Sequence, residues 1–437
     1  MKGSPWLDEA PRTRPVGVLE EDDSVDVAIV GGGISGLATA YRLLKESDRQ
    51  VILLERELVG HGATGHNGGQ VVAAFELRFG ALVEAMGEER TVQGYRELNS
   101  GWDLLREMLR SMGAEDLLQM VIGQLGLSTV EDLQSWSAEM RKRRELGLPS
   151  GIVRAADDVR SSPGSGDDVE LAYRDVIEDL LWTGDHRYLA AVEMAAGLMN
   201  SYLFTERLAE HLLASFPERF TLVERSPVDL MRLGDEVYLR CNRRTVLTDQ
   251  VVLCTNGYRP PRMEVCSVPA INGRIRGVVG YMISDAQGQG VPGARAYFRR
   301  GLKDEPYFYL TRRRYQDAWL TAVGGPEEPL VGRDYDAGTI YHPGAFDRLE
   351  GFMKETRPGH WTGRDRQWQG LMGYTSTGVR AVGQDPSIPA LYYNMGCNGI
   401  GLLSAVAGAK RISELMNGRR LAPSMFDPDA PPMKEKR

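Results

Sequence analysis

The sequence predicts an α/β fold in two parts: a nucleotide-binding domain around a parallel sheet, and a second domain with a mainly antiparallel sheet and helices. Three features carry this prediction. A glycine-rich strand–helix–strand unit lies near the start, closely spaced strands lie between residues 277 and 325, and a strand, a glycine loop and a helix lie near the end. A chain of 437 residues also exceeds what one hydrophobic core usually organises, which favours two domains.

The first unit consists of two buried strands around a helix. Residues 25–30, VDVAIV, form a nearly continuous apolar run that stops at three glycines, as buried parallel strands do. Apolar side chains then recur at helical spacing over residues 35–46, and residues 51–54 form a second apolar run. A strand–helix–strand unit of this length is typical of the start of a nucleotide-binding domain.

The turn between the first strand and its helix carries the chemistry. Residues 31–36 read GGGISG and fit the pattern GxGxxG, in which glycines let backbone amides approach a pyrophosphate at a helix N-terminus. Glu55 ends the second strand, where its carboxylate can accept hydrogen bonds from ribose hydroxyls. The unit therefore predicts a dinucleotide site, and by itself it is compatible with both NAD and FAD.

The middle of the chain alternates helical and extended patterns. The patterns predict helices over residues 91–112, 128–146 and 205–215, a loop over 161–168, a hairpin over 228–241 with its turn at Gly234 and Asp235, and a buried strand that begins at residue 250.

Strand-like segments follow one another without helices between residues 277 and 325. They are rich in β-branched and aromatic residues, as in VVGYMIS and PYFYLTRR, and their spacing indicates an antiparallel sheet. Near the end, residues 390–418 are typical of a strand, a glycine loop and a helix, and Gly418 stands where a helix C-cap is expected.

Composition and charge exclude several classes of function. The net charge of −8 argues against a nucleic-acid partner, and no apolar run is long enough to cross a bilayer. Residues 1–24 lack the apolar core of a signal peptide, and the four cysteines lack metal-ligand spacing and suit a reducing compartment. We therefore expect a cytoplasmic protein with no metal, no membrane and no nucleic acid as partner; the sequence makes no prediction of the oligomeric state.

Both ends of the sequence suggest peripheral segments. Residues 1–24 are rich in proline and acidic residues, and we expect an N-terminal extension that is partly mobile or lies along the surface. Residues 419–437 are rich in proline, and we expect a loose C-terminal tail.

Three further segments carry a resemblance to a known family. Residues 62–70 read GATGHNGGQ, residues 251–258 read VVLCTNGY, and residues 368–383 and 396–402 match in part a C-terminal pattern of a tryptophan, glycines and the last helix. In these segments the chain resembles FAD-dependent oxidoreductases of the D-amino-acid oxidase (DAO) family, closest in look to γ-glutamylputrescine-oxidase-like and glycine or sarcosine oxidase-like members. The resemblance implies a discontinuous, Rossmann-like FAD-binding domain over residues 25–80, 201–260 and 366–418, and a substrate domain over residues 81–200 and 261–365.

The resemblance also implies which residues contact FAD. The pyrophosphate would lie on the GxGxxG turn, the adenosine on the end of the second strand, and the flavin on the GATGHNGGQ loop and the last helix. A helix N-terminus there would stabilise an anionic reduced flavin. The implied cofactor-binding residues are Gly31, Gly33, Ile34, Ser35, Gly36, Glu55, Arg56, Ala63, Thr64, His66, Asn67, Gly68, Gly69, Val228, Thr255, Gly257, Asn398, Gly399, Ile400 and Gly401.

His66 has two interpretations that stay open. Some members of the family carry a histidine at the matching place and bond it covalently to the flavin, whereas others bind FAD noncovalently. His66 is therefore either a covalent attachment point or a hydrogen-bonding neighbour of the cofactor. Zinc binding by His61 and His66 is disfavoured, because the glycines between them supply no rigid spacing and no third ligand is evident.

The chain departs from the family pattern at two places. Arg380 replaces a proline of the C-terminal pattern, and Tyr309 occupies the slot where relatives often carry an arginine that meets a substrate carboxylate. Arg380 either compensates for that arginine or is an exposed structural residue. Tyr307 and Tyr309 share one face of a strand, which is either a pocket wall or part of the core.

These observations predict an FAD-dependent amine or amino-acid oxidase or dehydrogenase. Hydride would pass from the carbon beside an amine nitrogen to the flavin, the imine would hydrolyse, and O2 or another acceptor would reoxidise the flavin. The candidate catalytic residues are His66, Tyr309 and Arg380. Two alternatives stay open: an FAD-dependent monooxygenase or other redox enzyme on the same FAD domain, and a flavoprotein with structural FAD that acts as a partner-binding subunit.

Overall fold

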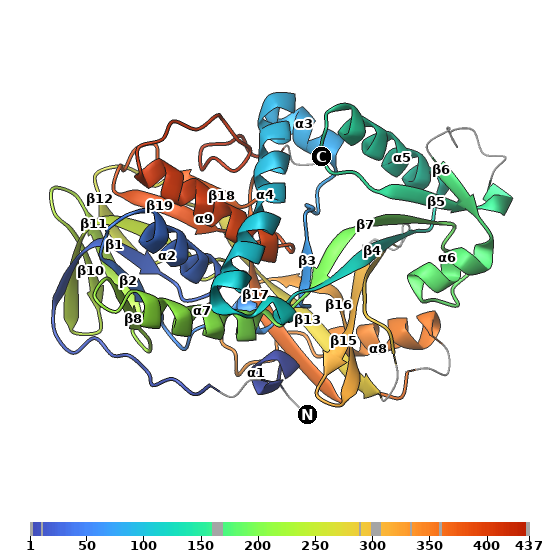
Figure 1. Ribbon diagram of the computed structural model, residues 1–437, viewed down its shortest axis with the longest axis horizontal. Helices are drawn as coiled ribbons and strands as arrows, with labels where there is room; N and C mark the ends of the chain where they lie inside the picture. Colours follow the sequence, from blue (N-terminus) through green and yellow to red (C-terminus); the bar gives the residue numbers. More distant parts are fainter. Residues whose placement is uncertain are drawn as a thin grey trace.

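The computed structural model describes residues 3–9, 12–159, 169–287, 290–298, 307–332, 334–357 and 361–433. The predicted loop at 161–168 lies outside these residues. Two sheets stand side by side, with the long helix α4 (Glu88–Met112) between them (Figure 1). No helix among the described residues is both long enough and apolar enough to span a membrane.

The first sheet is the predicted nucleotide-binding sheet. Its central strands are parallel: β11 pairs with β1, β1 with β2, and β2 with β8. The order within the described residues is β12-β9-β10-β11-β1-β2-β8, with β19 beside β11 and β18 beside β19. The strands are β1 (Asp23–Val30), β2 (Val51–Leu54), β8 (Phe220–Val223), β9 (Val228–Leu233), β10 (Val237–Cys241), β11 (Arg244–Leu253), β12 (Arg262–Val265), β18 (Ala381–Gln384) and β19 (Leu391–Met395).

Successive residues of a strand alternate between the two faces of the sheet, and helices cover one of these faces. Val27 and Ile29 of β1 pack in one core with apolar residues of the helices, whereas Ala28 and Val30 pack in a second core with residues of β9 and β10. The helices on this face are α2 (Ile34–Glu46), α7 (Ser201–Ser215) and α9 (Leu402–Met416), and α3 (Phe79–Met86) and α4 extend the same core by packing on them or on each other. The predicted cap Gly418 has φ +76°, and its N–H donates to Leu415 O at 2.9 Å.

The second sheet is mainly antiparallel, as the sequence predicts. Its order in the described residues is β17-β13-β16-β15-β14-β4-β7-β5-β6, with β3 beside β7; β4–β14 and β5–β6 are its parallel pairs. The strands are β3 (Gln70–Val72), β4 (Gln119–Leu127), β5 (Ile152–Ala156), β6 (Val169–Ala172), β7 (Ala190–Leu198), β13 (Ile275–Gln287), β14 (Gly293–Phe298), β15 (Tyr307–Tyr315), β16 (Ala318–Pro329) and β17 (Arg366–Thr375). The flanking helices are α5 (Val130–Glu145), α6 (Arg174–Leu181) and α8 (Gly344–Thr356).

Strand pairing differs from the predicted domain boundaries at three places. The strand β3 pairs with β7 and β17 pairs with β13, so both belong to the second sheet although the boundaries place them with the FAD domain. The strand β12 pairs with β9 in the first sheet, although the boundaries place it in the substrate domain. Each of these strands lies within about ten residues of a predicted crossing between the two sheets, where a local pattern does not reveal the partner.

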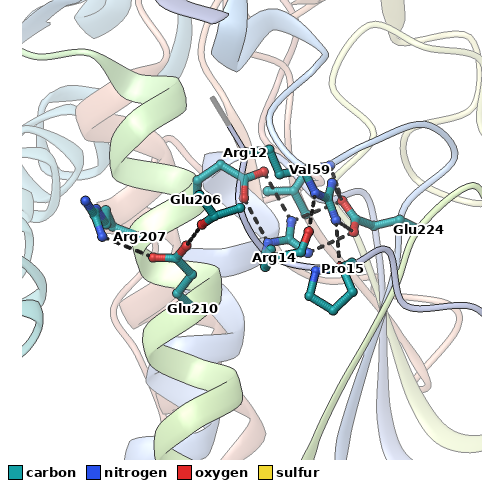
Figure 2. A network of polar contacts seen from close by, with 9 residues as sticks. Arg12, Arg14, Pro15, Val59, Glu206, Arg207, Glu210 and Glu224 are labelled. Carbon is teal, nitrogen blue, oxygen red and sulfur yellow. Dashed lines mark hydrogen bonds and ion pairs between the residues drawn. The ribbon is translucent and has the colours of Figure 1, made fainter. Parts of the chain in front are cut away.

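The start of the N-terminal segment is packed into the protein, contrary to the expectation of a mobile or surface extension, whereas residues 12–22 are half-buried or exposed and lie along the surface as expected. The helix α1 (Pro5–Glu9) inserts Trp6, which is 0% exposed, and the Trp6 indole donates to the Asn67 carbonyl oxygen. Further along, Arg12 and Arg14 both pair with the fully buried carboxylate of Glu224 (Figure 2). The composition of the segment suggested exposure, but Trp6 packs in the core and the two arginines form ion pairs with a buried glutamate.

The C-terminal tail is also packed rather than loose. Met425 and Phe426 are buried, and Phe426 O accepts the N–H of Val382 at 2.7 Å. Asp427 pairs with Arg411 of α9. The tail therefore fastens α9 to the edge of the first sheet.

Candidate active site

One cavity of about 670 Å³ is lined by residues of both sheets. It begins at the N-terminus of α2, follows the loop that contains the short helix η1 (Ala63–Gly65), and reaches the strands of the second sheet. A cavity of this size is in the range of small-molecule and cofactor sites.

The N-terminus of α2 opens into this cavity. Gly33 is its N-cap without a side-chain cap, and the Thr64 hydroxyl accepts the N–H of Ile34 at 3.1 Å. A Cβ on Gly31 would lie 2.7 Å from Cys254 O, and one on Gly36 would overlap Gly31 O, so the tight turn requires glycine at both positions. The remaining N–H groups and the helix dipole form an anion site that fits a pyrophosphate.

Glu55 follows β2 at the same end of the cavity. Its carboxylate accepts the N–H groups of Gly32 at 2.6 Å and Glu57 at 2.7 Å. Burial raises the pKa of Glu55, and these two hydrogen bonds oppose that rise. An acceptor held beside the glycine turn fits the ribose of a dinucleotide.

Arg380 lies buried between the N-termini of α2 and α9. It is 4% exposed, which excludes the predicted alternative of an exposed arginine. Its Nη1 donates to Ser35 Oγ at 2.9 Å and Asn394 O at 3.1 Å, its Nε to Ser404 Oγ at 3.2 Å, and its Nη2 to Gly401 O at 3.2 Å. These bonds hold the guanidinium near the start of α2, so we do not retain the prediction that it meets a substrate carboxylate.

The GATGHNGGQ loop is held in a fixed shape by its own polar groups. The Asn67 amide donates to Thr64 O and Ser201 Oγ, each at 2.8 Å. His66 Nδ1 lies 2.9 Å from Gly62 O, so Nδ1 carries the hydrogen and Nε2 keeps a lone pair. Burial lowers the pKa of His66, which makes the imidazole neutral near pH 7.

The start of α9 forms another wall. Gly399 has φ +71°, and a Cβ there would overlap the Glu76 carboxylate, so only glycine lets the two approach. Asn398 turns away from the cavity: its Oδ1 accepts the N–H of Thr375 at 2.9 Å, and its Nδ2 donates to Gly396 O at 2.9 Å.

Four polar side chains form a ring at the substrate-domain end of the cavity. The Tyr307 hydroxyl contacts Glu76 Oε1 at 2.8 Å and Glu327 Oε1 at 3.1 Å. The Tyr374 hydroxyl contacts Glu76 Oε1 at 2.9 Å and Glu327 Oε2 at 2.8 Å. We call Glu76, Tyr307, Glu327 and Tyr374 the acid–phenol ring. Burial and the Glu327 charge raise the pKa of Glu76 to about 7, and burial also raises the pKa of Glu327.

Tyr309 stands beside the ring and faces the cavity, as Tyr307 does. Its ring covers Gly68, where a Cβ would lie 2.9 Å from Cε2, and it covers Gly324 on the next strand. No hydrogen bond to the Tyr309 hydroxyl is found in the described part of the chain. Burial, followed by the charges of Glu327 and Glu76, raises the pKa of Tyr309, so the phenol stays neutral.

The remaining wall beside the ring is apolar. On β14 and β15, Ala296 pairs with Tyr309 and Phe298 with Tyr307, which puts these alanine and phenylalanine side chains on the cavity face. Apolar lining residues of this end are Trp136, Leu125, Val192, Met194, Ala196, Met282, Ala294, Ala296, Phe298 and Met372.

The structure brings most of the predicted site residues to this one cavity. Three do not line it: Gly36, Gly257 and Asn398. Gly257 is required by packing, because a Cβ there would overlap Met372 O. In the described residues no group of three His, Cys, Asp or Glu side chains is placed to hold a metal ion.

Sequence reasoning missed the acid–phenol ring apart from Tyr307. Glu76 ends the apolar segment QVVAAFE directly after the GATGHNGG motif, and Glu327 follows GGP at the end of a predicted strand. An acidic residue at either place could have been predicted as a candidate site residue. Their partnership joins positions 251 residues apart in the sequence, which only the fold reveals.

Comparisons with known proteins agree with this geometry. The gamma-glutamylputrescine oxidoreductase of Escherichia coli is 31% identical over 151 residues, which are 33% of this chain and 35% of that protein, so the chain matches about a third of that relative. The solved structure of L-proline dehydrogenase from P. horikoshii shares the fold with a TM-score of 0.68 at 16% identity, over 94% of this chain and 98% of that one. The solved structure of glycine oxidase from Geobacillus kaustophilus has a TM-score of 0.66 at 17% identity, over 95% of this chain and 100% of that one.

The family model described as FAD dependent oxidoreductase matches residues 26–415. This match covers both sheets and confirms the resemblance inferred from the motifs. The uncapped helix N-terminus, the close glycines and the Glu55 carboxylate are the features that such a cofactor needs. The chain belongs to the FAD dependent oxidoreductase (DAO) family and is an enzyme that binds FAD.

Proposed function

We propose that the protein oxidises the C–N bond of a small amine or amino-acid-like substrate. The observation that carries this proposal is the cavity of about 670 Å³, which joins a pyrophosphate-type site at α2 to an apolar chamber with the half-buried acid–phenol ring. The names of the similar proteins, a gamma-glutamylputrescine oxidoreductase, an L-proline dehydrogenase and a glycine oxidase, support substrates of this class.

When bound, FAD supplies the hydride acceptor for the carbon beside the amine nitrogen. The N–H groups of α2 and the Arg380 guanidinium would bind its pyrophosphate, and Glu55 would accept hydrogen bonds from the ribose hydroxyls. The loop with His66 and the Tyr309 ring, which covers Gly68, line the cavity beside the acid–phenol ring and orient the substrate there. The apolar wall excludes water, and the acid–phenol ring holds the proton that an ammonium substrate must release before oxidation.

Anaerobic mixing of the purified holoenzyme with a panel of amines and amino acids tests this function. Bleaching of the flavin absorption bands by at least one of them is expected, with recovery on admission of O2 or of an added electron acceptor. If NADPH bleaches the flavin and every amine fails, the monooxygenase alternative replaces the proposal. If dithionite alone bleaches it, FAD is structural.

Acid precipitation of the holoenzyme distinguishes the two roles of His66. A yellow pellet demonstrates covalent FAD, and a colourless pellet under a yellow supernatant demonstrates noncovalent FAD. Nε2, which keeps its lone pair, is the ring nitrogen available for either role, because Nδ1 donates to Gly62 O. A His66→Ala variant that still gives a yellow pellet excludes attachment at this residue.

A further inference from the structure

The acid–phenol ring contains fewer hydrogens than its contacts require. Two phenols supply two hydrogens, yet four oxygen–oxygen contacts of 2.8–3.1 Å connect them with the two carboxyl groups. With both carboxyl groups ionised, two of these contacts would place oxygens together without a hydrogen between them. The ring therefore needs a further positive partner, which is a proton or an N–H donor.

Glu76 offers an oxygen to such a partner. Both phenols use its Oε1, and within the described residues its Oε2 accepts no hydrogen bond. Glu76, Tyr307 and Glu327 line the cavity, and the free hydroxyl of Tyr309 stands next to them. An ammonium group has three donors, which match these acceptors.

The described cations that line the cavity are engaged elsewhere. Arg56 stacks on Tyr258, 4.4 Å from its ring centre, and Arg259 pairs with Asp334 at 3.2 Å, both toward the adenosine end. Arg380 is bonded to the starts of α2 and α9 as described above.

Arg295 also lines the cavity, but its side chain belongs to the opposite face of the second sheet. It pairs with Leu310 on the neighbouring strand, one residue out of phase with Ala296 and Tyr309, and its Nε donates to Leu180 O at 2.9 Å. The exposed Arg276, beyond Tyr374, lowers the pKa of Glu327 from outside the cavity. A substrate carboxylate at the ring would thus meet two half-buried acidic groups, and no arginine side chain of the described residues is directed at it.

We propose that Glu76 and Glu327 make this enzyme select amines that bind as cations, carry an apolar body and have no carboxylate on the reacting carbon. The ammonium group lies on the acid–phenol ring, and the hydrocarbon body lies along the apolar wall of β4, β7 and β14. This inference rests on the proposed function and narrows its substrate class from amines and amino acids to alkyl- and arylalkylamines.

Matched substrate pairs test the selection on the wild-type holoenzyme. Each pair differs by the carboxylate alone: butylamine with norvaline, pentylamine with norleucine, and phenethylamine with phenylalanine. Anaerobic flavin reduction should be at least roughly tenfold more efficient with the amine of the best pair, which is the scale of one charge-assisted hydrogen bond. Equal or better reduction by the amino acids overturns the inference and leaves the proposed function intact.

Ligand binding tests the same inference without turnover. Visible difference spectra of the flavin should report pentylamine binding at concentrations where pentanoate causes no change. Tighter binding of pentanoate than of pentylamine overturns the inference. If neither amines nor amino acids reduce the flavin, the proposed function fails, while these spectra still decide the charge preference of the cavity.

Two conservative variants locate the selection in the ring. Glu76→Gln and Glu327→Gln should each raise the pentylamine dissociation constant roughly tenfold while FAD content stays unchanged. Glu218→Gln, on the exposed surface after α7, is the matched control and should leave it unaltered. Wild-type affinity in both ring variants, with FAD bound, overturns the assignment to these residues.

Discussion

Arg380 carries a charge in an unusual environment. It is fully enclosed, and no carboxylate pairs with it in the described part of the chain; burial lowers its pKa. Two helix N-termini, each the positive end of a dipole, lie on either side of it. Three positive groups with no anion are costly together, and we propose that the pyrophosphate of FAD supplies the missing anion.

Replacing Arg380 with Met should therefore separate folding from cofactor binding. We expect at least a roughly tenfold rise in the dissociation constant for FAD, because one charge-assisted contact is lost. The melting temperature of the apoprotein should stay equal or rise, since an unpaired buried charge is removed. FAD titration of the apoprotein by flavin fluorescence measures the first quantity, with the exposed Arg243→Met as control. Unchanged affinity would place the pyrophosphate elsewhere.

Glu76 should make stability fall as pH rises through the neutral range. Its pKa is about 7 in the folded protein and 4.5 as an ordinary glutamate, because of burial and the Glu327 charge, against hydrogen bonds from Tyr307 and Tyr374. Between these values the folded state binds more protons, so the free energy of unfolding decreases with pH, by about 1.4 kcal/mol for each pKa unit.

A Glu76→Gln variant removes this titration. Relative to wild type, its melting temperature should increase from pH 5 to pH 8, as followed by thermal unfolding of the holoenzyme. Glu218→Gln should run parallel to wild type at every pH. A constant offset between Glu76→Gln and wild type would show that Glu76 titrates normally.

At the scale of the elements, the N-terminal segment acts as a strap across the two sheets. Asp8 and Glu9 pair with Arg366 and Arg313 of the second sheet, whereas Arg12 and Arg14 pair with acids of the first domain. Burial alone would raise the pKa of Glu224, but hydrogen bonds from Arg12 and Arg14 lower it to about 2. The stability from this contact is therefore present above pH 4.5 and is lost as pH falls toward 2.

Arg14→Ala should loosen the strap. It breaks buried pairs with Glu206 and Glu224, at 2.8 Å each, and we expect a loss of about 3 kcal/mol in the free energy of unfolding. Urea unfolding measures this loss. Arg207→Ala, which removes an exposed pair with Glu210 nearby (Figure 2), should cost below about 1 kcal/mol. Similar losses in both variants would mean that burial contributes nothing here.

Elements with a strong local pattern are predicted well from the sequence. The run VDVAIV and the glycines after it place β1 and α2 within two residues, because apolar periodicity and turn chemistry are local properties. The partners of β12 and β17 are set by the packing of distant strands, so their sheet could not be assigned. Trp6 and Phe426 lie in proline-rich segments that look exposed, and their pockets form from residues elsewhere in the chain.

The candidate site also has one part that the sequence predicts and one part that only the fold reveals. The glycines of α2, Glu55 and the loop with His66 belong to contiguous motifs, and the structure gathers them at one end of the cavity. Glu76, Glu327 and Tyr374 come from three separate elements with no shared motif. Their contact depends on the strand order of the second sheet, which no local pattern specifies.

At the scale of the whole molecule, the cavity is lined by both sheets, so we propose that FAD bound there links them. A ligand that binds only the folded state stabilises it by about 2.7 kcal/mol at one hundred times its dissociation constant. We therefore expect FAD to raise the melting temperature of the entire protein in a single transition, as measured by calorimetry of apo- and holoprotein. A transition that FAD leaves in place would reveal an independently folding second domain.

The strap also fixes the order of events during synthesis. Asp8 leaves the ribosome long before Arg366, with which it pairs, and Trp6 must wait for the strands of its pocket, which include Trp368. At translation rates of roughly 5–20 residues per second, this interval is on the order of tens of seconds. The strap is thus made early and docks late, and during that interval the nascent GATGHNGGQ loop has one side uncovered.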